Sequence, residues 1–401
     1  MPSILMIHFS PYPVDVRIRR EAETLIEAGM SVDTISIRSK NQKPREIHYG
    51  VTTYRINLSK KRSSKLRYIW EYLYFALITF FKAAMLYRKR RYDVIHVHNM
   101  PDFLVFCAFI PKMLGAKVLL DLHDPMPEIY MTKYKIPITH PVIRFLVLIE
   151  KMSIRFADHV ITPNVAFREL FIKRGCGAHK IDIVMNTPME RILNDSGPVK
   201  PAIFTRKKEE FFIMYHGTIL LRNGCLDILE AINTIKSEIP GIRFLAFGNG
   251  EAVEIFKNRI VELGLSDMVQ YFGLVSNELI FNAIKKIDIG VIPNQKNPFT
   301  NINFPVRIFE YLALKKPVIV PRTNGIMDYF TEDSIIYFEP GDTLNLAEVI
   351  IRCYRSPEKL KEKIDKGYDI YQNYTWQKQR RVLETITSDL IKNGRDAVPG
   401  N

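Results

Sequence analysis

An arginine and a glutamate stand three residues apart in a stretch, 303–320, that predicts the start of a helix. Asn303 can accept hydrogen bonds from the first amides of a helix, and Pro305 has no amide that needs a partner. Arg307 and Glu310 then project from the same side of the first turn. Free amides and a guanidinium suit a phosphate, and a carboxylate one turn further in suits sugar hydroxyls. An ordinary helix with a surface ion pair would show the same residues.

The order Pro-x-Arg-x-x-Glu-Tyr-Leu-Ala from Pro305, followed by Lys-Pro-Val-Ile from Lys316, resembles the donor-binding helix of the family 4 glycosyltransferases. That family has the GT-B fold, and in it the diphosphate of a nucleotide sugar rests on the N-terminus of this helix. The resemblance implies that the amides near Val306 and the Arg307 guanidinium bind the departing diphosphate, and that Glu310 holds the ribose. Other segments agree with the family in the same order over nearly the whole chain.

A glycine-bounded loop at 217–224 follows a predicted strand at 211–216. Glycine allows the backbone to approach a ligand closely, Thr218 offers a hydroxyl and Arg222 offers a fork for a diphosphate. The family usually has an arginine just after the first glycine and a lysine just before the second. This chain has Thr218 and Asn223 there, so we expect Arg222 to supply the missing charge.

The Gly-Asn-Gly loop at 248–250 resembles the loop that lines the family's nucleotide pocket. A glutamate that contacts the transferred sugar usually stands eight positions before Glu310, but this chain has Ile302 there, so the identity of the sugar does not follow from the resemblance. The residues expected to bind the donor are Gly217, Thr218, Asn223, Gly248, Asn249, Asn303, Pro305 and Val306, and those expected to act in catalysis are His123, Arg222, Arg307 and Glu310.

In the first half of the chain, a buried strand at 117–122 leads to His123 and Asp124 in a loop stiffened by prolines. Ligands of open α/β sheets bind beyond the carboxyl ends of the strands, which is where this loop lies. The resemblance implies that His123 contacts the donor sugar or its leaving phosphate. Candidates on the acceptor side are Asp15, His98, Asp124 and Glu128, although capping a helix would explain Asp15 and Asp124 equally well.

His96 and His98 project to the same side of a predicted strand at 92–98, as a pair of metal ligands would. No third ligand lies nearby in the sequence, and neither Cys-x-x-Cys nor Asp-x-Asp occurs. We therefore predict no metal site and no cofactor other than a UDP- or GDP-type donor substrate. His96 is expected to be a packed, hydrogen-bonded histidine.

The bulk composition describes a globular chain of two domains. Its 401 residues are more than one hydrophobic core usually holds. Hydrophobic residues make up 47% of the chain and charged residues 25%, which is typical of a folded globular protein and not of a disordered one. The first apolar run, Ile4–Ile7, is too short for a signal sequence and has no basic residues before it. The four cysteines have no paired spacing. These features predict a cytoplasmic protein.

A formal charge of +14 predicts a partner that carries negative charge. The basic residues gather at both ends of the segment 60–91, whose middle, 72–81, is aromatic and apolar. A stretch of this length is too short to cross a bilayer, which needs about 20 apolar residues. It suits a helix lying on the inner face of an anionic plasma membrane, or a core helix with solvated ends. No nucleic-acid-binding module is present.

Strand and helix patterns alternate along both halves of the chain, which predicts parallel, doubly wound sheets. The expected fold class is α/β of the GT-B type, with two Rossmann-like domains facing a cleft. The first domain spans 1–190 and is completed by a helix at about 376–401 that crosses back to it. A polar linker spans 191–208, and the donor domain spans 209–375.

These features together predict a metal-independent glycosyltransferase that moves a sugar, with retention of configuration, from a nucleotide sugar to a glycan or polyprenyl-linked acceptor in cell-surface polysaccharide synthesis. Two alternatives stay open. A nucleotide-sugar epimerase on the same fold would process the donor without an acceptor. A non-catalytic subunit would bind nucleotide without turnover, as the changes at Thr218, Asn223 and Ile302 would allow.

Overall fold

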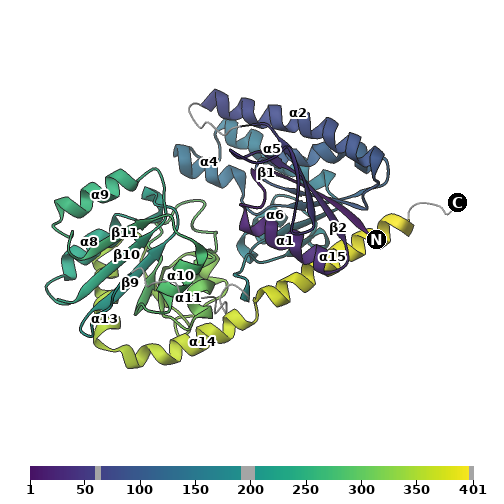
Figure 1. Cartoon of the computed structure of the whole chain (residues 1–401). Coiled ribbons are helices and arrows are strands. Elements are labelled where there is room, and N and C mark those ends of the chain that lie inside the picture. Colours follow the sequence, from purple (N-terminus) through teal and green to yellow (C-terminus); the bar gives the residue numbers. More distant parts are fainter. Residues whose placement is uncertain (59–64, 191–203, 397–401) are drawn as a thin grey trace. The chain divides into compact units, whose positions relative to one another are not determined.

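The structure, a computed structural model, describes residues 1–58, 65–190 and 204–396 (Figure 1). The chain forms two compact units. Unit 1 comprises Met1–Asn186 together with Gln377–Asn401, and unit 2 comprises Thr187–Trp376. The break lies close to the predicted end of the first domain at residue 190. Most of the predicted linker, up to residue 203, lies outside the described residues, as do Lys60, Lys61 and Arg62 of the basic segment.

Unit 1 is an eight-stranded sheet in the order β3-β4-β2-β1-β5-β6-β7-β8, parallel except for the β3–β4 hairpin. Strands such as β1 are buried on both faces, as parallel strands covered by helices must be. The elements are β1 (Ser3–Pro11), α1 (Val16–Glu27), β2 (Ser31–Ile37), β3 (Arg45–His48), β4 (Val51–Ile56), α2 (Lys65–Lys89), β5 (Val94–His98), η1 (Asp102–Ala108), α3 (Phe109–Met113), β6 (Lys117–Asp121), α4 (Met126–Tyr134), α5 (Pro141–Phe156), β7 (His159–Thr162), α6 (Val165–Lys173), η2 (Ala178–Lys180), β8 (Ile181–Ile183) and α15 (Trp376–Asp396).

Unit 2 is an all-parallel six-stranded sheet in the order β11-β10-β9-β12-β13-β14. Its core is formed by the aliphatic and aromatic side chains of the strands and of α8, α9 and α13. The elements are β9 (Phe211–His216), η3 (Leu221–Asn223), α8 (Asp227–Ile235), β10 (Ile242–Phe247), α9 (Val253–Glu262), β11 (Val269–Gly273), α10 (Asn277–Ile284), β12 (Ile289–Val291), α11 (Arg307–Ala313), β13 (Val318–Pro321), α12 (Asn324–Met327), β14 (Ile336–Phe338), α13 (Thr343–Arg355), η4 (Pro357–Lys359) and α14 (Leu360–Gln372).

Both sheets reverse their strand order beside their first strand. In unit 1, β1 lies between β2 and β5, and in unit 2, β9 lies between β10 and β12. At such a point the loops at the carboxyl ends of the two strands leave in opposite directions and open a crevice, where doubly wound proteins bind their ligands. The order of the strands therefore places one candidate site in each unit.

The C-terminal helix α15 belongs to unit 1 from Gln377 onward, as predicted. Arg380 donates to Glu27 at the end of α1 at 2.7 Å, and the Gln379 side-chain oxygen accepts from the Met185 amide at 2.8 Å. These contacts fix the helix along the unit formed by the first half of the chain.

Helix α2 differs from the expectation that its apolar stretch is too short to span a bilayer. The helix is continuous, and its part from Ile69 to Lys89 is long and apolar enough, by length and composition, to cross a membrane. One face of the helix, which includes Tyr72, Phe75, Thr79 and Ala83, is nevertheless buried within unit 1.

Candidate functional site

Two glycine loops meet at the carboxyl ends of β9 and β10. A Cβ atom on Gly248 would lie 1.8 Å from the Gly217 carbonyl oxygen, and one on Gly250 would lie 2.1 Å from that of Ile219. Gly217 and Gly248 also have φ angles of 137° and 126°, which residues with a side chain rarely adopt. The sequence therefore needs glycine at these positions to bring the two backbones together at the edge where unit 2 reverses its strand order.

Arg307 packs against the backbone of the first of these loops, at Gly217. Its Nη1 donates to the His216 carbonyl oxygen at 2.5 Å, and its guanidinium lies 4.8 Å from the centre of the Tyr215 ring. A Cβ on Gly217 would come within 2.5 Å of that same Nη1. Burial opposes the charge, but Tyr215, Tyr311 and Glu310 raise the pKa of Arg307 above its ordinary value. A permanently charged guanidinium therefore lies directly beneath the glycine turn.

Glu310 reaches the same place from the first turn of α11. Its carboxylate lies 2.5 Å from Nε2 of His216, and Nδ1 of His216 lies 3.0 Å from the Tyr311 hydroxyl. Tyr311 in turn donates to the Met214 carbonyl oxygen at 2.9 Å. Arg307 and Glu310 therefore project from the same side of α11, as their spacing predicts, and both contact His216 at the end of β9.

The start of α11 corrects one prediction. Asn303 does not cap the helix: the N-cap residue is Val306, and no side chain caps it. The amides of Ile308 and Phe309 instead bond to the carbonyl oxygens of Pro305 and Val306 at 3.0 Å each, because the chain enters the helix through a tight turn. No described residue accepts from the amides of Val306 and Arg307.

The remaining predicted donor residues lie in the same loops. The Thr218 carbonyl oxygen accepts from the Asn223 side chain at 2.8 Å and from the Tyr215 hydroxyl at 2.9 Å, so Asn223 holds the loop together. Asn249 accepts at its carbonyl oxygen from the Ile219 amide. Arg222 lies in η3 with an exposed side chain, and within the described ranges no residue pairs with its guanidinium.

In unit 1, His123 follows β6 and faces the end of its own strand. Its Nδ1 lies 3.5 Å from Oδ2 of Asp121, and its amide donates to Asn99 Oδ1 at 3.2 Å. The Asn99 side chain also donates to the Asp124 carbonyl oxygen at 2.7 Å. The loops after β5 and β6 are therefore bonded to each other at the carboxyl edge of the sheet, and they hold His123 with little exposure.

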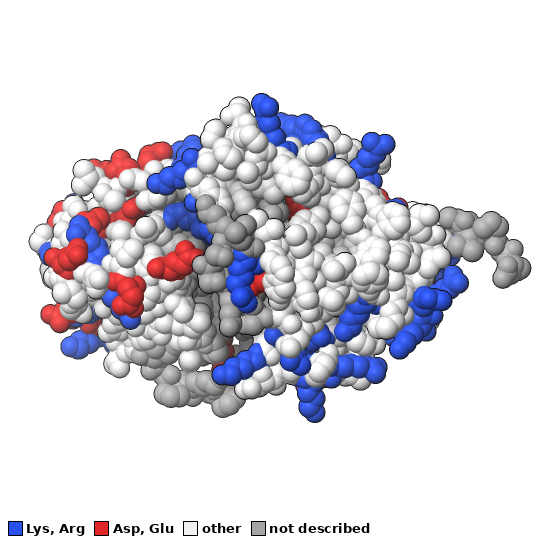
Figure 2. Space-filling model, turned by 90° about the horizontal axis from the view of Figure 1, so that it is seen from above, with Lys and Arg blue, Asp and Glu red and all other residues white. Residues whose placement is uncertain are grey.

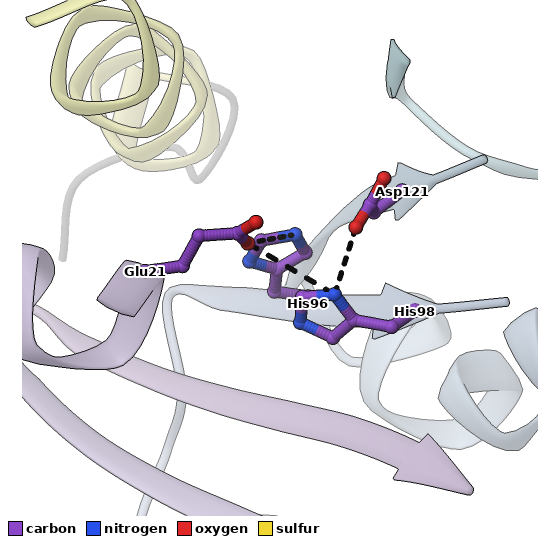
Figure 3. A group of neighbouring side chains, drawn as sticks. All are labelled: Glu21, His96, His98 and Asp121. Atoms are coloured by element: carbon purple, nitrogen blue, oxygen red, sulfur yellow. Dashed lines mark hydrogen bonds and ion pairs between the residues drawn. The ribbon is translucent and has the colours of Figure 1, made fainter. Parts of the chain in front are cut away.

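Asp121 also belongs to a buried cluster with His96, His98 and Glu21 (Figure 3). His98 Nδ1 lies 3.0 Å from Asp121 Oδ2, whereas Glu21 Oε2 lies 3.8 Å from His96 Nε2 and 3.9 Å from His98 Nδ1. Neither ring nitrogen of His96 has a hydrogen-bond partner in the described part of the chain. The prediction that His96 is buried is confirmed, and the prediction that it is hydrogen-bonded is wrong.

Burial sets the protonation states of this cluster. Loss of solvent, with the nearby Asp121, raises the pKa of Glu21 to about 8. Burial also lowers the pKa of both histidines below their ordinary value. Burial alone would raise the pKa of Asp121, but His123 and His98 bring it well below its usual range. At neutral pH the cluster therefore contains neutral histidines, a protonated Glu21 and a charged Asp121.

The cluster offers four atoms that a divalent cation could bind, all within 4.8 Å of one another. The sequence did not reveal this set because Glu21 and Asp121 come from α1 and β6, far from the two histidines. Arg17, one turn before Glu21 in α1, is buried close to this cluster, and Asp121, with Asp15 just outside the cluster, raises the Arg17 pKa against the effect of burial. Charge is thus balanced by a protein group.

The other predicted acceptor-side residues differ in their surroundings. Asp15 is the N-cap residue of α1 but makes no capping hydrogen bond, and its carboxylate lies 3.8 Å from Arg17. Burial raises the pKa of Asp124. Glu128 is buried and paired with Arg174, which also binds Glu150 at 2.9 Å. The Glu128 carboxylate is therefore occupied by an ion pair within unit 1.

Sequence reasoning missed three buried polar residues at or just after the carboxyl ends of strands. His216 links Glu310 to β9, and Asp121 bonds to His98 and lies 3.5 Å from Nδ1 of His123. Asn294 follows β12 and is buried with no described partner for its side-chain oxygen. His216 ends β9 and Asn294 follows β12, the two strands at the point where the sheet of unit 2 reverses, whereas Asp121 ends β6, one strand further from the reversal in unit 1.

Two family models match the chain. Residues 14–187 match the glycosyl transferase 4-like domain, and residues 198–369 match the glycosyl transferases group 1 domain. The matched ranges correspond to unit 1 and unit 2 in turn, and together they cover most of the chain.

Individual relatives are distant but cover most of the chain. An N-acetyl-alpha-D-glucosaminyl L-malate synthase of Bacillus anthracis is 20% identical over 82% of this chain and 83% of its own. A chitobiosyldiphosphodolichol beta-mannosyltransferase of Debaryomyces hansenii is 21% identical over 82% and 75%. The crystal structure of HepE from Anabaena in complex with UDP-glucose is similar with a TM-score of 0.71 and 16% identity, over 97% and 100%. That similarity establishes the GT-B-type fold.

Proposed function

This chain belongs to the group 1 glycosyltransferases, and we propose that it transfers a sugar from a UDP- or GDP-type donor to a glycan or polyprenyl-linked acceptor, with retention of anomeric configuration and without a metal. The observation that carries the proposal is the convergence of Gly217, Arg307 and Glu310 at the point where the sheet of unit 2 reverses.

The diphosphate is proposed to lie against the Gly217 turn and the start of α11. The backbone amides of Val306 and Arg307 have no partner among the described residues, and the Arg307 guanidinium lies beneath the turn. Amides and a fixed cation stabilise the negative charge that develops as the nucleotide leaves, because they need no reorganisation at the moment of reaction. Arg222, which pairs with no residue in the described ranges, can approach the same phosphates from the loop.

Glu310 is proposed to accept hydrogen bonds from the ribose hydroxyls. His216 holds its carboxylate in place, so the acceptor oxygen is oriented before the nucleotide arrives. On unit 1, His123 is proposed to contact the donor sugar, with the Asp121 carboxylate 3.5 Å from its Nδ1. Asp15 and Asp124 lie near the same edge and are the candidates for acceptor contacts, whereas His98, predicted as a third, is fully buried against Asp121. Glu128 is the weakest of these candidates because Arg174 already occupies it.

Two relatives support the choice of substrates. HepE binds UDP-glucose, and the name of the Debaryomyces hansenii enzyme describes a lipid-linked acceptor. A thermal-shift screen against UDP-, GDP- and ADP-sugars tests the donor: a ligand at 100 times its Kd stabilises the protein by about 2.7 kcal/mol. NMR of the product then tests retention. Stabilisation by nucleotide with no transfer to any acceptor would instead favour a non-catalytic subunit.

A further inference from the structure

Helix α2 carries a second apolar face, which is turned to solvent. Leu73, Leu77 and Phe81 are 57%, 58% and 62% exposed, and Trp70 and Met85 extend the same row along the helix. Steps of three and four residues keep these side chains on one face, opposite the buried Phe75 and Thr79. A surface helix of a water-soluble domain normally turns its polar side outward. A large exposed apolar patch such as this one is typical of a surface that binds another molecule or a membrane.

Two neighbouring helices continue the apolar surface. On α5, Phe145, Leu148 and Met152 are 60%, 53% and 52% exposed at the same helical spacing. Met113, in α3, is 73% exposed. Both α2 and α5 pack on η1, which leads directly into α3, so the three helices cover the same side of the sheet. Their outward faces therefore form one surface, here named the apolar face.

The charges around the apolar face have a single sign. The acidic residues of α2, α3 and α5 are Glu71 and Glu150; both are buried, and each pairs with an arginine, at 3.1 Å and 2.9 Å. The exposed charged side chains of α2 and α5 are all basic among those described: Arg67, Arg88, Lys89, Arg144, Lys151 and Arg155. Figure 2 looks down on the α2 side of unit 1 and shows a broad uncharged surface with Lys and Arg along its edges.

We propose that the apolar face is a docking surface for an anionic lipid bilayer, which it enters with the row Trp70, Leu73, Leu77 and Phe81 while the flanking cations contact the lipid headgroups. Bulky apolar side chains bordered by cations match the boundary between acyl chains and negative headgroups. The rings of Trp70 and Tyr74 are stacked, with their centroids 5.0 Å apart. Trp and Tyr side chains favour the membrane–water interface, where the lipid headgroups meet the acyl chains. The proposal deepens the proposed function, on which it rests for the lipid-linked acceptor.

In this arrangement α2 lies on the membrane and does not cross it. Crossing would expose Tyr72, Phe75 and Ala83, which are buried within unit 1, and would separate the helix from η1 and β4. Docking leaves that packing intact, because only side chains that are already exposed enter the lipid.

The chain contains its own reporter of this contact. It has two tryptophans: Trp70 is 53% exposed on the apolar face, and Trp376 is 4% exposed. Vesicles of roughly a third phosphatidylglycerol in phosphatidylcholine should shift the Trp70 emission to the blue, and lipids brominated in the acyl chain should quench it. Raising the salt concentration should weaken binding, because salt screens the headgroup charge. No donor or acceptor is present, so this assay is independent of glycosyl transfer.

The decisive variant is Leu73→Ser/Leu77→Ser/Phe81→Ser. All three positions are exposed, so the fold should persist, and partition to the anionic vesicles should fall by at least about tenfold. The control is a matched triple in unit 2, Ile255→Ser/Val261→Ser/Leu274→Ser, whose side chains are 49%, 70% and 77% exposed. The control should bind vesicles within about twofold of the wild type.

Charge reversal at Arg144 and Lys151 should remove the preference for phosphatidylglycerol. Three outcomes would overturn the proposal: wild-type protein that stays free of anionic vesicles at low salt, equal partition of the two triple variants, or a wild-type dimer that the Leu73/Leu77/Phe81 variant converts to monomer without any vesicle binding. The last result would assign the apolar face to a second copy of the chain.

Discussion

Replacing Arg307 by alanine should abolish most of the transfer activity and lower the stability of unit 2 by a moderate amount. Removing one preorganised donor from the charge that develops on a leaving group costs about 2.7–4 kcal/mol, or roughly 10²–10³ in kcat. The folded state loses the charge-assisted hydrogen bond to the His216 carbonyl oxygen, which contributes about 1.5–3 kcal/mol. It also loses the contact with the Tyr215 ring, which contributes about 0.5–2 kcal/mol.

The hydrogen bond and the ring contact together contribute about 2–5 kcal/mol, which predicts a Tm lower by roughly 4–20 °C, because each kcal/mol corresponds to about 2–4 °C in a unit of this size. Activity must therefore be measured well below the melting temperature of the variant, with a circular dichroism spectrum as the check on folding. Steady-state kinetics with saturating donor give kcat, and a thermal scan gives Tm on the same preparation.

Arg243→Ala is the matched control. Like Arg307, Arg243 donates to a carbonyl oxygen, that of Asp267, at 3.0 Å, and it also binds the Glu210 carboxylate at 2.9 Å. It lies near the amino end of β10, at the opposite edge of the sheet from the glycine loops. Its loss should lower Tm but leave kcat within about twofold, since it makes no contact with the site. Near-normal turnover by folded Arg307→Ala, or an equal loss in the control, would refute the reasoning.

Three further predictions concern Glu310, Glu21 and metal dependence. Glu310→Gln should raise the KM for the donor by about ten- to a hundredfold, because a ribose loses a charged acceptor; an unchanged KM would remove Glu310 from nucleotide binding. Because the folded-state pKa of Glu21 is raised from 4.5 to about 8, the folded protein holds this proton more tightly, so the free energy of unfolding should fall as pH rises from about 4.5 to about 8. Urea titrations of Glu21→Gln should lack that fall, and an identical slope in variant and wild type would contradict the assignment. Turnover should survive removal of divalent ions by a chelator; a loss that zinc or magnesium restores would contradict metal independence, and loss of that rescue in His96→Ala would then assign the cation to the Glu21–His96–His98–Asp121 cluster.

The architecture followed from the sequence because parallel sheets leave strong local patterns. Short apolar runs separated by helical patterns predicted two doubly wound sheets, and the spacing of Arg307 and Glu310 predicted that both would project from one side of a helix. The polar cap at Asn303 was wrong because sequence preference for a capping side chain competes with backbone hydrogen bonding. In the structure, the carbonyl oxygens of Pro305 and Val306 accept from the amides of Ile308 and Phe309 instead.

The candidate site was only partly predictable, because its partners come from distant elements. Glu21 and Asp121 are separated from His96 by whole strands and helices, and only the folded sheet brings them together. A buried carboxyl group has no mark in the sequence that distinguishes it from a solvated one. For α2 the sequence left two readings open, a helix on a membrane surface and a core helix, because it does not show that Phe75 and Thr79 form the buried side.

The most direct test of this account is a crystal structure of the protein with a bound nucleotide sugar or its unreactive analogue. The account predicts the pyrophosphate beside Gly217, within hydrogen-bond distance of the Val306 and Arg307 amides, with the ribose on Glu310. A pyrophosphate bound at any other edge of unit 2, or bound mainly by unit 1, would contradict it.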